Sequence, residues 1–347
     1  MSERRTGHVT LQSIAERANV HVSTVSRALD SNPARPVSVE TVARIRAIAD
    51  ELGFEPNPWA RSLRTHRTRT IGLVIPRLVD NVIATVFESA ESAAEARGYQ
   101  AITVSSGDDP ERFDNATQRL LDRRVDGFLI AAARLDDPTI DRLADRGVPF
   151  VLLNRGSSDH VWFHADDELG AYLATRHLLD RGHRRIAHVG GVMNTSTGVD
   201  RQRGYVRAMK SAGLPADDAL ILASDLSIDS GVEAGNRLLA GDDRPTAIFA
   251  ANDYVAIGIM AAARDLAIRI PEDLAIVGFN DTRLSEAMSV PLSSVAIPLP
   301  TMGREAMNGL ADLIEDIPVQ SKTYPAQLRI RASSAARVGP SLVDGRP

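Results

Sequence analysis

The chain has 347 residues, of which 44% are hydrophobic and 24% are charged, as in an ordinary folded protein. This length suits a small domain followed by a larger two-lobed body. The absence of cysteine excludes disulfide bonds, thiol chemistry and cysteine metal sites. No apolar run approaches the roughly 20 residues of a membrane helix, and the N-terminal residues lack the apolar stretch of a signal peptide. We therefore expect a cytoplasmic protein with no membrane partner.

The charge is unevenly distributed along the chain. Residues 1–70 contain eleven arginines, no lysine and seven acidic residues, which gives them a net charge of +4. The whole chain has a net charge of −5, so the remaining 277 residues have a net charge of −9. A basic N-terminal segment on an acidic body indicates that only this segment faces a polyanion such as nucleic acid. A solvated basic tail would lack the regular apolar spacing found here.

The apolar spacing of the N-terminal segment predicts helices at residues 11–18, 22–29 and 38–52. Thr10 suits the N-cap of the first helix, and Gly53 suits the end of the third. Asn19 falls in the tight turn between the first two helices, where a left-handed backbone is needed. Two short helices joined by a tight turn, with a third helix closing a small core, are typical of a helix-turn-helix unit.

Residues 57–69 form a polar, basic connection between this segment and the rest of the chain. Pro58 suits the first position of a helix. The segment 57–64 is too short to stay helical alone in water, so a helix here would need a partner.

From Ile71 onward, the short apolar runs IGLVI, AITV, GFLIA, FVLLN, IAHVG, AIFAA and LAIVGF alternate with amphipathic helical segments. This alternation predicts parallel sheets covered by helices on both faces. Open sheets of this kind bind ligands beyond the carboxyl ends of their strands. The polar residues that follow the strands are Asp80, Asn81, Asn154, Arg155, Asn252, Asp253, Asn280 and Asp281. Their amides and carboxylates suit a ligand with many hydroxyl groups.

Several segments together resemble the lactose-repressor/galactose-repressor (LacI/GalR) family of transcription regulators, along nearly the whole chain. They are TLQSIAERANVHVSTVSRAL, VSVETVARIRAIADELGFEPNPWARSLRT, TIGLVIP, HLLDRGHRRIAHVGG, RQRGYVRAM, AIFAANDYVAIG, LAIVGFND and LRIRASS. The resemblance implies a small all-α helix-turn-helix head and an α/β, periplasmic-binding-protein-like body of two parallel-sheet lobes. The implied domains are the DNA-binding head at 1–56, a hinge helix and linker at 57–69, the effector-binding and dimerisation body at 70–337, and a loose tail at 338–347.

The resemblance also implies how the head contacts DNA. The second helix lies in the major groove, where Val22, Ser23 and Arg27 face base edges. Arg27 can form two hydrogen bonds with a guanine, while Thr24 and Ser26 contact phosphates. His21 stands where the family usually has serine and could donate to a phosphate, which suggests a pH-dependent affinity. The predicted DNA-binding residues are Thr10, His21, Val22, Ser23, Thr24, Ser26, Arg27, Asn57, Arg61, Leu63 and Arg64.

By the same resemblance, the hinge helices of two subunits pair in the minor groove and Leu63 wedges between base pairs. The alternative of a buried linker leucine is disfavoured because Arg61, Ser62 and Arg64 beside it are polar. A symmetric homodimer that reads two inverted half-sites of a DNA operator follows. The C-terminal residues show no heptad segment that would build a tetramer.

The effector-binding residues implied by the resemblance are Asp80, Asn81, Asn154, Phe163, Arg201, Leu226, Asn252 and Asn280. Relatives often have Asn-Pro-Phe-Phe where this chain has Asn81-Val82-Ile83-Ala84, so Phe163 or Trp162 is expected to supply the missing stacking face. The loss favours a sugar or sugar derivative over a purine. Arg201 could instead be a surface arginine paired with Asp200 or Glu233. Two other polar residues have structural alternatives, Asp253 as a helix cap and Asp281 as a turn residue.

Competing functions have little support in the sequence. Dinucleotide, phosphate-loop and zinc-protease motifs are absent, and no cofactor or catalytic residue is expected. The pair Asp166-Asp167 suits a helix cap, and His177 and His183 lack metal-ligand spacing. An extracytoplasmic sugar-binding protein would share the body but not the head. The effector would change how the lobes sit and thereby the spacing of the hinge helices, causing induction if it favours the splayed state and corepression if it favours the compact one.

Overall fold

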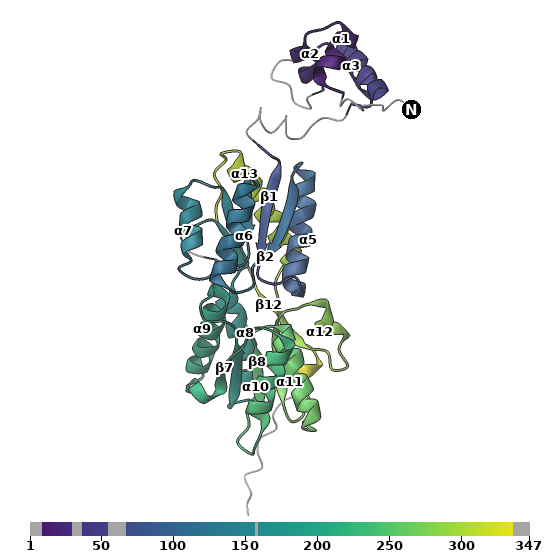
Figure 1. Cartoon of the computed structure of the whole chain (residues 1–347). Helices are drawn as coiled ribbons and strands as arrows, with labels where there is room; N and C mark the ends of the chain where they lie inside the picture. The colour runs from purple at the N-terminus through teal and green to yellow at the C-terminus, as the bar shows by residue number, and fades with distance from the viewer. Residues whose placement is uncertain (1–8, 30–36, 55–66, 157–158, 336–347) are drawn as a thin grey trace, which may run out of the picture. The chain divides into compact units, whose positions relative to one another are not determined.

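The computed structural model describes residues 9–29, 37–54, 67–156 and 159–335 (Figure 1). The chain divides into two compact units, residues 1–68, which we call the head, and residues 69–347, which we call the body. Within the described ranges, no helix is both long enough and apolar enough to span a membrane.

The head consists of three helices around a small core, as the sequence predicts. The helices are α1 (Leu11–Ala18), α2 (Val22–Ala28) and α3 (Val39–Leu52). Their buried side chains form one cluster of Ile14, Ala15, Ala18, Val25, Ala28, Ile45 and Ala49. Three predicted end signals are confirmed: Thr10 accepts a hydrogen bond from Ser13 N, Asn19 has a φ of 51° and Gly53 has a φ of 66°. The tight turn and the packing of α3 therefore fix the orientation of α2 within the head.

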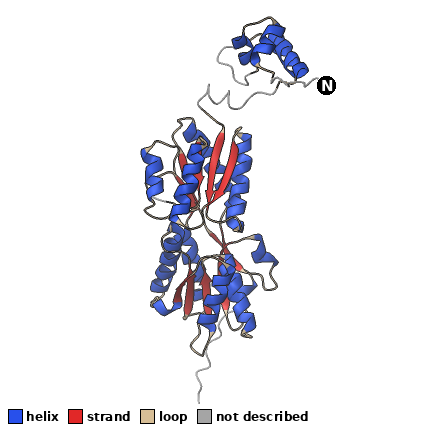
Figure 2. Ribbon diagram, viewed as in Figure 1, coloured by secondary structure: helices blue, strands red, loops and turns tan. Residues whose placement is uncertain are grey.

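The first lobe of the body is a six-stranded parallel sheet with the strand order β11-β5-β4-β3-β1-β2. Its strands are β1 (Thr70–Ile75), β2 (Gln100–Ser105), β3 (Gly127–Ile130), β4 (Phe150–Leu153), β5 (Trp162–Ala165) and β11 (Lys322–Tyr324). Its helices are α5 (Asn81–Ala96), α6 (Pro110–Asp122), α7 (Pro138–Asp145) and α13 (Leu299–Ile314). The sheet lies between these helices, as Figure 2 shows.

The second lobe has a second six-stranded sheet with the order β12-β10-β9-β8-β6-β7. Its strands are β6 (Ile186–Gly190), β7 (Ile221–Ala223), β8 (Ala247–Ala250), β9 (Ala275–Asn280), β10 (Ser293–Ala296) and β12 (Gln327–Arg329). Its helices are α8 (Asp167–Asp180), α9 (Ser196–Ser211), α10 (Ile228–Leu239), α11 (Asp253–Asp265) and α12 (Arg283–Ala287), with short 3-10 turns at Asp218–Leu220 and Ala332–Ser334. Only β12 runs antiparallel to its neighbour among the described strands.

The chain passes between the lobes three times. It enters the second lobe after β5, returns to the first lobe for α13 and β11, and enters the second again for β12. One hydrophobic cluster accordingly extends from Ile71 and Met302 in the first lobe to Phe249 and Phe279 in the second. The two parallel-sheet lobes joined by several crossovers confirm the predicted fold class.

Three histidines of the second lobe, His177, His183 and His188, are buried without forming a metal site among the described residues. His188 stacks on the rings of Tyr205 and Phe249, and its Nδ1 lies 3.1 Å from Phe249 O. Burial lowers the pKa of His188 from 6.5 to about 4, since a charged imidazolium would lose its hydration.

We expect His188 to weaken the folded state as the pH falls from about 6.5 to about 4. In this window the unfolded chain binds a proton at His188 that the folded chain does not, and the loss approaches about 1.4 kcal/mol per pH unit. The variant His188→Gln supplies an amide N–H donor in place of the imidazole N–H but does not titrate. The melting midpoint of the wild type should therefore fall toward that of the glutamine variant as the pH is lowered. A constant difference between the two proteins would contradict the prediction, and the comparison cancels the contribution of every other titrating group.

Candidate functional site

The residues of α2 differ in how far they are exposed. Ser23 is exposed and Val22 half-buried, whereas Val25 and Ala28 point into the head core. Thr24 and Ser26 are half-buried beside them. Ser23 therefore lies on the side of α2 away from the core, whereas Val22 also packs against the core.

His21 is the N-cap residue of α2. Its Nδ1 accepts a hydrogen bond from Ser23 N at 3.2 Å and lies 2.8 Å from Ser23 Oγ. Histidine is not among the preferred N-cap residues, but its ring here supplies the acceptor that the helix end needs. This role requires Nδ1 without a proton, which leaves Nε2 as the donor of the ring.

The side chain of Arg27 lies along its own helix. Nε donates to Ser23 O at 3.1 Å, and Nη2 donates to Thr24 Oγ1 at 3.3 Å. The guanidinium must leave these hydrogen bonds before it can reach a base edge. Thr10 is also occupied, because its hydroxyl and that of Ser13 form a reciprocal capping box at α1.

A cavity of about 490 Å³ lies between the two lobes of the body. Its described lining residues are Pro76, Arg77, Val79, Asp80, Asp108, Arg155, Asp225, Leu226, Ser227, Ile228, Asp229, Tyr254 and Leu284. A smaller space of about 30 Å³ shares Asp80, Arg155 and Leu226 with it, and also touches Asn154, Thr197, Arg201, Asn252 and Asn280. Most of these residues follow the carboxyl ends of parallel strands, where open α/β sheets bind ligands. We call the two spaces together the cleft.

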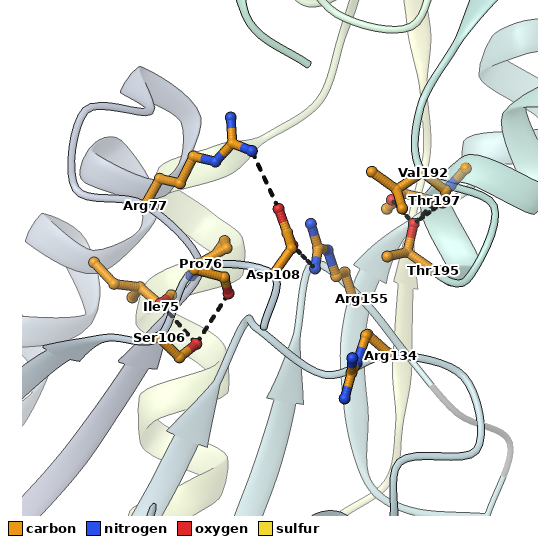
Figure 3. Close-up of polar contacts among 12 residues, drawn as sticks. Ile75, Pro76, Arg77, Ser106, Asp108, Arg134, Arg155, Val192, Thr195 and Thr197 are labelled. Carbon is orange, nitrogen blue, oxygen red and sulfur yellow. Dashed lines mark hydrogen bonds and ion pairs between the residues drawn. The ribbon is translucent and has the colours of Figure 1, made fainter. Parts of the chain in front are cut away.

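On the first-lobe side, Asp108 lies between two arginines (Figure 3). Arg155 Nη1 donates to Asp108 Oδ1 at 3.0 Å, and Arg77 Nη2 lies 3.5 Å from Asp108 Oδ2. Arg77, Asp108 and Arg155 follow β1, β2 and β4, so the carboxyl ends of three parallel strands of one sheet bring them to the same edge. Arg155 is 5% exposed, and burying its guanidinium without Asp108 would be costly.

Hydrogen bonds also join the lobes across the cleft. Arg77 Nη1 donates to Asp225 O at 3.1 Å, and Tyr254 Oη donates to Val79 O at 3.2 Å. Gly156 N donates to Ser196 Oγ at 3.0 Å. These contacts are specific to one relative placement of the lobes and would change if the lobes moved.

Arg201 lies at the floor of the cleft and is 4% exposed. Its Nε donates to Asp167 Oδ1 at 2.7 Å, its Nη1 donates to Ala251 O at 2.6 Å, and its guanidinium lies 3.9 Å from the centre of the Phe279 ring. The alternative of a surface arginine paired with Asp200 or Glu233 is wrong, because the partner is the buried Asp167. Burial raises the pKa of Asp167, and Arg201 opposes that rise.

Close helix packing brings this pair together. A Cβ at Gly204 of α9 would lie 2.2 Å from Glu168 O of α8, so only glycine allows the two backbones to approach this closely. Asp166, as predicted, caps α8 by accepting from Leu169 N, which leaves Asp167 free to face Arg201.

Some of the polar residues after β8 and β9 are hydrogen-bonded within the protein, and others have a polar atom that could contact a ligand. Asn252, not Asp253, is the N-cap of α11: its Oδ1 accepts from Val255 N at 2.8 Å, and its Nδ2 donates to Leu226 O at 3.0 Å. Asp253 instead accepts from Ser294 Oγ and Thr282 N, so the suggestion that it caps the helix is wrong.

Beyond β9, Asp281 has a φ of 51° and pairs with Arg331 at 2.6 Å, as suits a structural turn residue. Asn280 is 5% exposed, and its Oδ1 has no hydrogen-bond partner among the described residues. Leu226 lines the cleft with a φ of 68°, a conformation that costs a non-glycine residue about 1–2 kcal/mol. Backbone strain of this kind is concentrated at functional sites.

Three sequence predictions for the cleft are corrected by the structure. Phe163 is 5% exposed in the first-lobe core, where its ring lies against Gly309 of α13, so it offers no stacking face to the cleft. Trp162 stacks on His164 at 4.0 Å and does not line the cleft either. The side chain of Asn81 is exposed outside the cleft lining, and only its backbone N–H contacts Tyr254 Oη. Phe163 points toward α13 because side chains alternate between the two faces of the sheet along β5.

The head and the body each match a known protein-family model. Residues 10–57 match the family model for bacterial regulatory proteins of the lacI family, and residues 175–334 match the model for a periplasmic binding protein-like domain. The HTH-type transcriptional repressor PurR of Vibrio atlanticus (strain LGP32) is 33% identical, over 88% of this chain and 92% of its own length. The chain belongs to the lacI family of bacterial regulatory proteins.

Other lacI-family proteins resemble it over similar lengths. Catabolite control protein A of Priestia megaterium is 31% identical, over 94% of this chain and 99% of its own. The Lac repressor dimer bound to operator and the anti-inducer ONPF has a TM-score of 0.85 and 26% identity, over 95% of this chain and 100% of that chain. The transcriptional regulator CelR in complex with cellobiose has a TM-score of 0.72 and 30% identity, over 94% of this chain and 99% of that chain.

As a member of the lacI family, the chain is a DNA-binding transcriptional repressor with an effector-binding body, and it is not an enzyme. Of the residues predicted to contact DNA, those that lie within the described part of the head are Thr10, His21, Val22, Ser23, Thr24, Ser26 and Arg27. The predicted hinge residues Asn57, Arg61, Leu63 and Arg64 lie outside the described residues.

Several cleft residues of this lacI-family body escaped the sequence reading. Arg77 and Asp108 follow β1 and β2 by two and three positions, and Tyr254 is the second residue of α11. Position after a strand is a signal for the first two, but their neighbours in sequence share it, so position alone does not single them out. Tyr254 carried no such signal, since its place depends on how α11 approaches the first lobe.

The cap at His21 can be tested directly. His21→Ala removes the acceptor for Ser23 N and should cost the head about 1 kcal/mol, whereas His21→Ser supplies a hydroxyl acceptor and should cost little. Hydrogen exchange of the α2 amides in the full chain should therefore be several-fold faster in the alanine variant and nearly unchanged in the serine variant. Equal exchange in all three proteins would contradict the capping role.

Proposed function

We propose that the chain is a cytoplasmic homodimer that represses transcription from a palindromic operator and is switched by a sugar or sugar derivative bound in the cleft. The observation that carries this proposal is the combination, in one chain, of a helix-turn-helix head and a cleft lined by polar strand ends from two lobes. The first feature suits a DNA partner, and the second suits a small polar ligand.

The dimer follows from the symmetry of DNA recognition. One helix-turn-helix head reads one half-site, and two heads related by a twofold axis read an inverted repeat. The Lac repressor structure that resembles this chain is described as a dimer bound to operator. The net charge of +4 on residues 1–70 suits contact with phosphates.

In this proposal, Val22, Ser23 and Arg27 read base edges, with Thr10, His21, Thr24 and Ser26 positioning the head against phosphates. Asn57, Arg61, Leu63 and Arg64 belong to a hinge that contacts the minor groove, with Leu63 as the wedge. Arg27 would exchange its hydrogen bonds with Ser23 and Thr24 for bonds to a base.

A sugar fits the cleft better than a flat aromatic ligand. Tyr254 is the one aromatic side chain among the described residues that line the two spaces, which leaves no second ring to sandwich a base. The related regulator CelR is described as a cellobiose complex. The predicted contacts are Asp80, Asn154, Arg201, Leu226, Asn252 and Asn280, which all line the cleft.

The hydrogen bonds that cross the cleft supply the coupling. A ligand between Asp80 and Asn280 touches both lobes, so its binding favours the lobe placement in which both contacts form. The bonds from Arg77 to Asp225 and from Tyr254 to Val79 then strengthen or break together. In a dimer, the altered lobes change the spacing of the two hinges and hence the affinity for the operator.

The hinge wedge gives the first test of this function. Leu63→Ala should weaken operator binding at least about tenfold, or about 1.4 kcal/mol, because the apolar wedge between base pairs is lost. The operator would first be selected from random duplexes by the full chain, and affinities would be measured at one salt concentration. Leu266→Ala, at an exposed leucine of the body, is the matched control. Equal affinities for the two variants, or a selected site without inverted symmetry, would reject the proposed mode of binding.

Arg201 gives the test of the effector site. Arg201→Ala should abolish the response to any sugar that raises the melting midpoint of the wild-type chain. It also leaves Asp167 buried without its cation, which should cost several kcal/mol. The double variant with Asp167→Asn should recover part of this stability without recovering the ligand response. A double variant that responds normally to the sugar would show that Arg201 acts only through folding.

A further inference from the structure

The cleft has more acidic than basic side chains. Its larger space is lined by the two arginines Arg77 and Arg155 and by the four aspartates Asp80, Asp108, Asp225 and Asp229, a net charge of −2. A charge imbalance inside a partly enclosed space repels ligands of the same sign, because water screens the charges less there.

The arginines of the cleft are already neutralised by carboxylates. Arg155 pairs with Asp108 at 3.0 Å, and Arg77 lies 3.5 Å from carboxylate oxygens of both Asp108 and Asp225. Arg201 pairs with Asp167 at 2.7 Å. An anionic ligand would therefore meet arginines whose positive charge is already offset by carboxylates. The cations near the cleft therefore do not form a vacant anion site.

Asp80, by contrast, forms no ion pair with the other described residues. This half-buried residue is the N-cap of α5, and its carboxylate accepts from the backbone N–H groups of Val82 and Ile83. No cationic side chain forms an ion pair with it in the part of the chain that the structure describes. Burial raises the pKa of Asp80, and the more distant Arg155 and Arg201 offset this only in part. The carboxylate therefore has backbone donors but no cationic partner among the described residues, and an incoming ligand could supply further donors.

Asn280 provides a second acceptor at the same place. It lines the smaller space together with Asp80, it is 5% exposed, and its Oδ1 is buried without a partner among the described residues. A buried carbonyl oxygen without a hydrogen bond costs about 1–3 kcal/mol, and a ligand donor would recover that cost. Asp80 belongs to the first lobe and Asn280 to the second, so one ligand group can satisfy both lobes.

We propose that Asp80 and Asn280 Oδ1 together accept hydrogen bonds from a donor-rich group of the effector, an ammonium or neighbouring hydroxyls, and that the cleft excludes carboxylated and phosphorylated ligands. This inference rests on the proposed function, because it assumes that the effector binds in the cleft. Neutral sugars and amino sugars share the donor chemistry and differ only in whether they also neutralise Asp80.

The first experiment needs no ligand. Asp80→Asn keeps a good N-cap but removes a carboxylate that has no cation, so the melting midpoint of the full chain should rise by about 2 °C or more. Asp109→Asn makes the same change at the exposed N-cap of α6 and should leave the midpoint nearly unchanged. Asp108→Asn should lower it, because Arg155 loses its partner. A midpoint for Asp80→Asn at or below that of the wild type would overturn the proposal.

The second experiment compares ligands on one ring. D-glucose, D-glucosamine, D-glucuronate and D-glucose 6-phosphate would be added at equal concentration to the full wild-type chain, since a ligand that binds the folded state raises its melting midpoint. The proposal expects a larger rise with glucose or glucosamine than with either anion, and a loss of the glucosamine advantage in Asp80→Asn. A larger rise with glucuronate or with the phosphate would overturn it.

These outcomes separate the inference from the function on which it rests. The ligand-free comparison of Asp80→Asn, Asp109→Asn and Asp108→Asn involves no DNA, so its sign does not depend on operator binding. If the chain selects no duplex from a random pool, the proposed operator binding is contradicted. The melting comparison of the three aspartate variants still tests the inference.

Discussion

The buried ion pair between Arg201 and Asp167 holds together the part of the body on which the cleft depends. Asp167 begins α8 directly after the chain has crossed from the first lobe, and Arg201 lies on α9. The guanidinium also contacts Ala251 O after β8 and the ring of Phe279 on β9. One charged group therefore connects a crossover, two helices and two strand ends at the floor of the cleft. A ligand that touches Arg201 acts on the segment that joins the lobes.

Most of the fold could be predicted from the sequence because its signals are local. Apolar spacing, the cap at Thr10 and the left-handed turn at Asn19 define the head, and the seven apolar runs mark seven of the strands. The strands that the sequence did not reveal are β5, β7, β10, β11 and β12, each of only three or four residues. In β11 and β12, mostly exposed side chains give no apolar run. Their pairing depends on the last two crossovers, which bring residues far apart in the chain together.

The candidate cleft was predictable in position but not in its partners. Asp80 and Asn154 follow strands of the first sheet, and Asn280 ends a strand of the second. Because parallel strands end at the same edge of a sheet, strand position alone identifies these residues. Whether such a residue is open to a ligand depends on its neighbours. Asn252 is occupied as a helix cap, while Asn280 Oδ1 has no partner among the described residues. Phe163 was misplaced because α13, which covers it, comes from more than 130 residues further along the chain.

Three of the costs that this body tolerates lie where its lobes face each other. Leu226 has a left-handed backbone, Asn280 Oδ1 is buried without a partner, and the carboxylate of Asp80 lacks a cation among the described residues. The interiors of the lobes, in contrast, are filled by well-buried aliphatic and aromatic side chains. A ligand that relieves the costs at the cleft gains free energy only in the lobe placement that lets it reach both sides. That difference between placements is what a regulator needs, because a ligand that binds two states equally shifts neither.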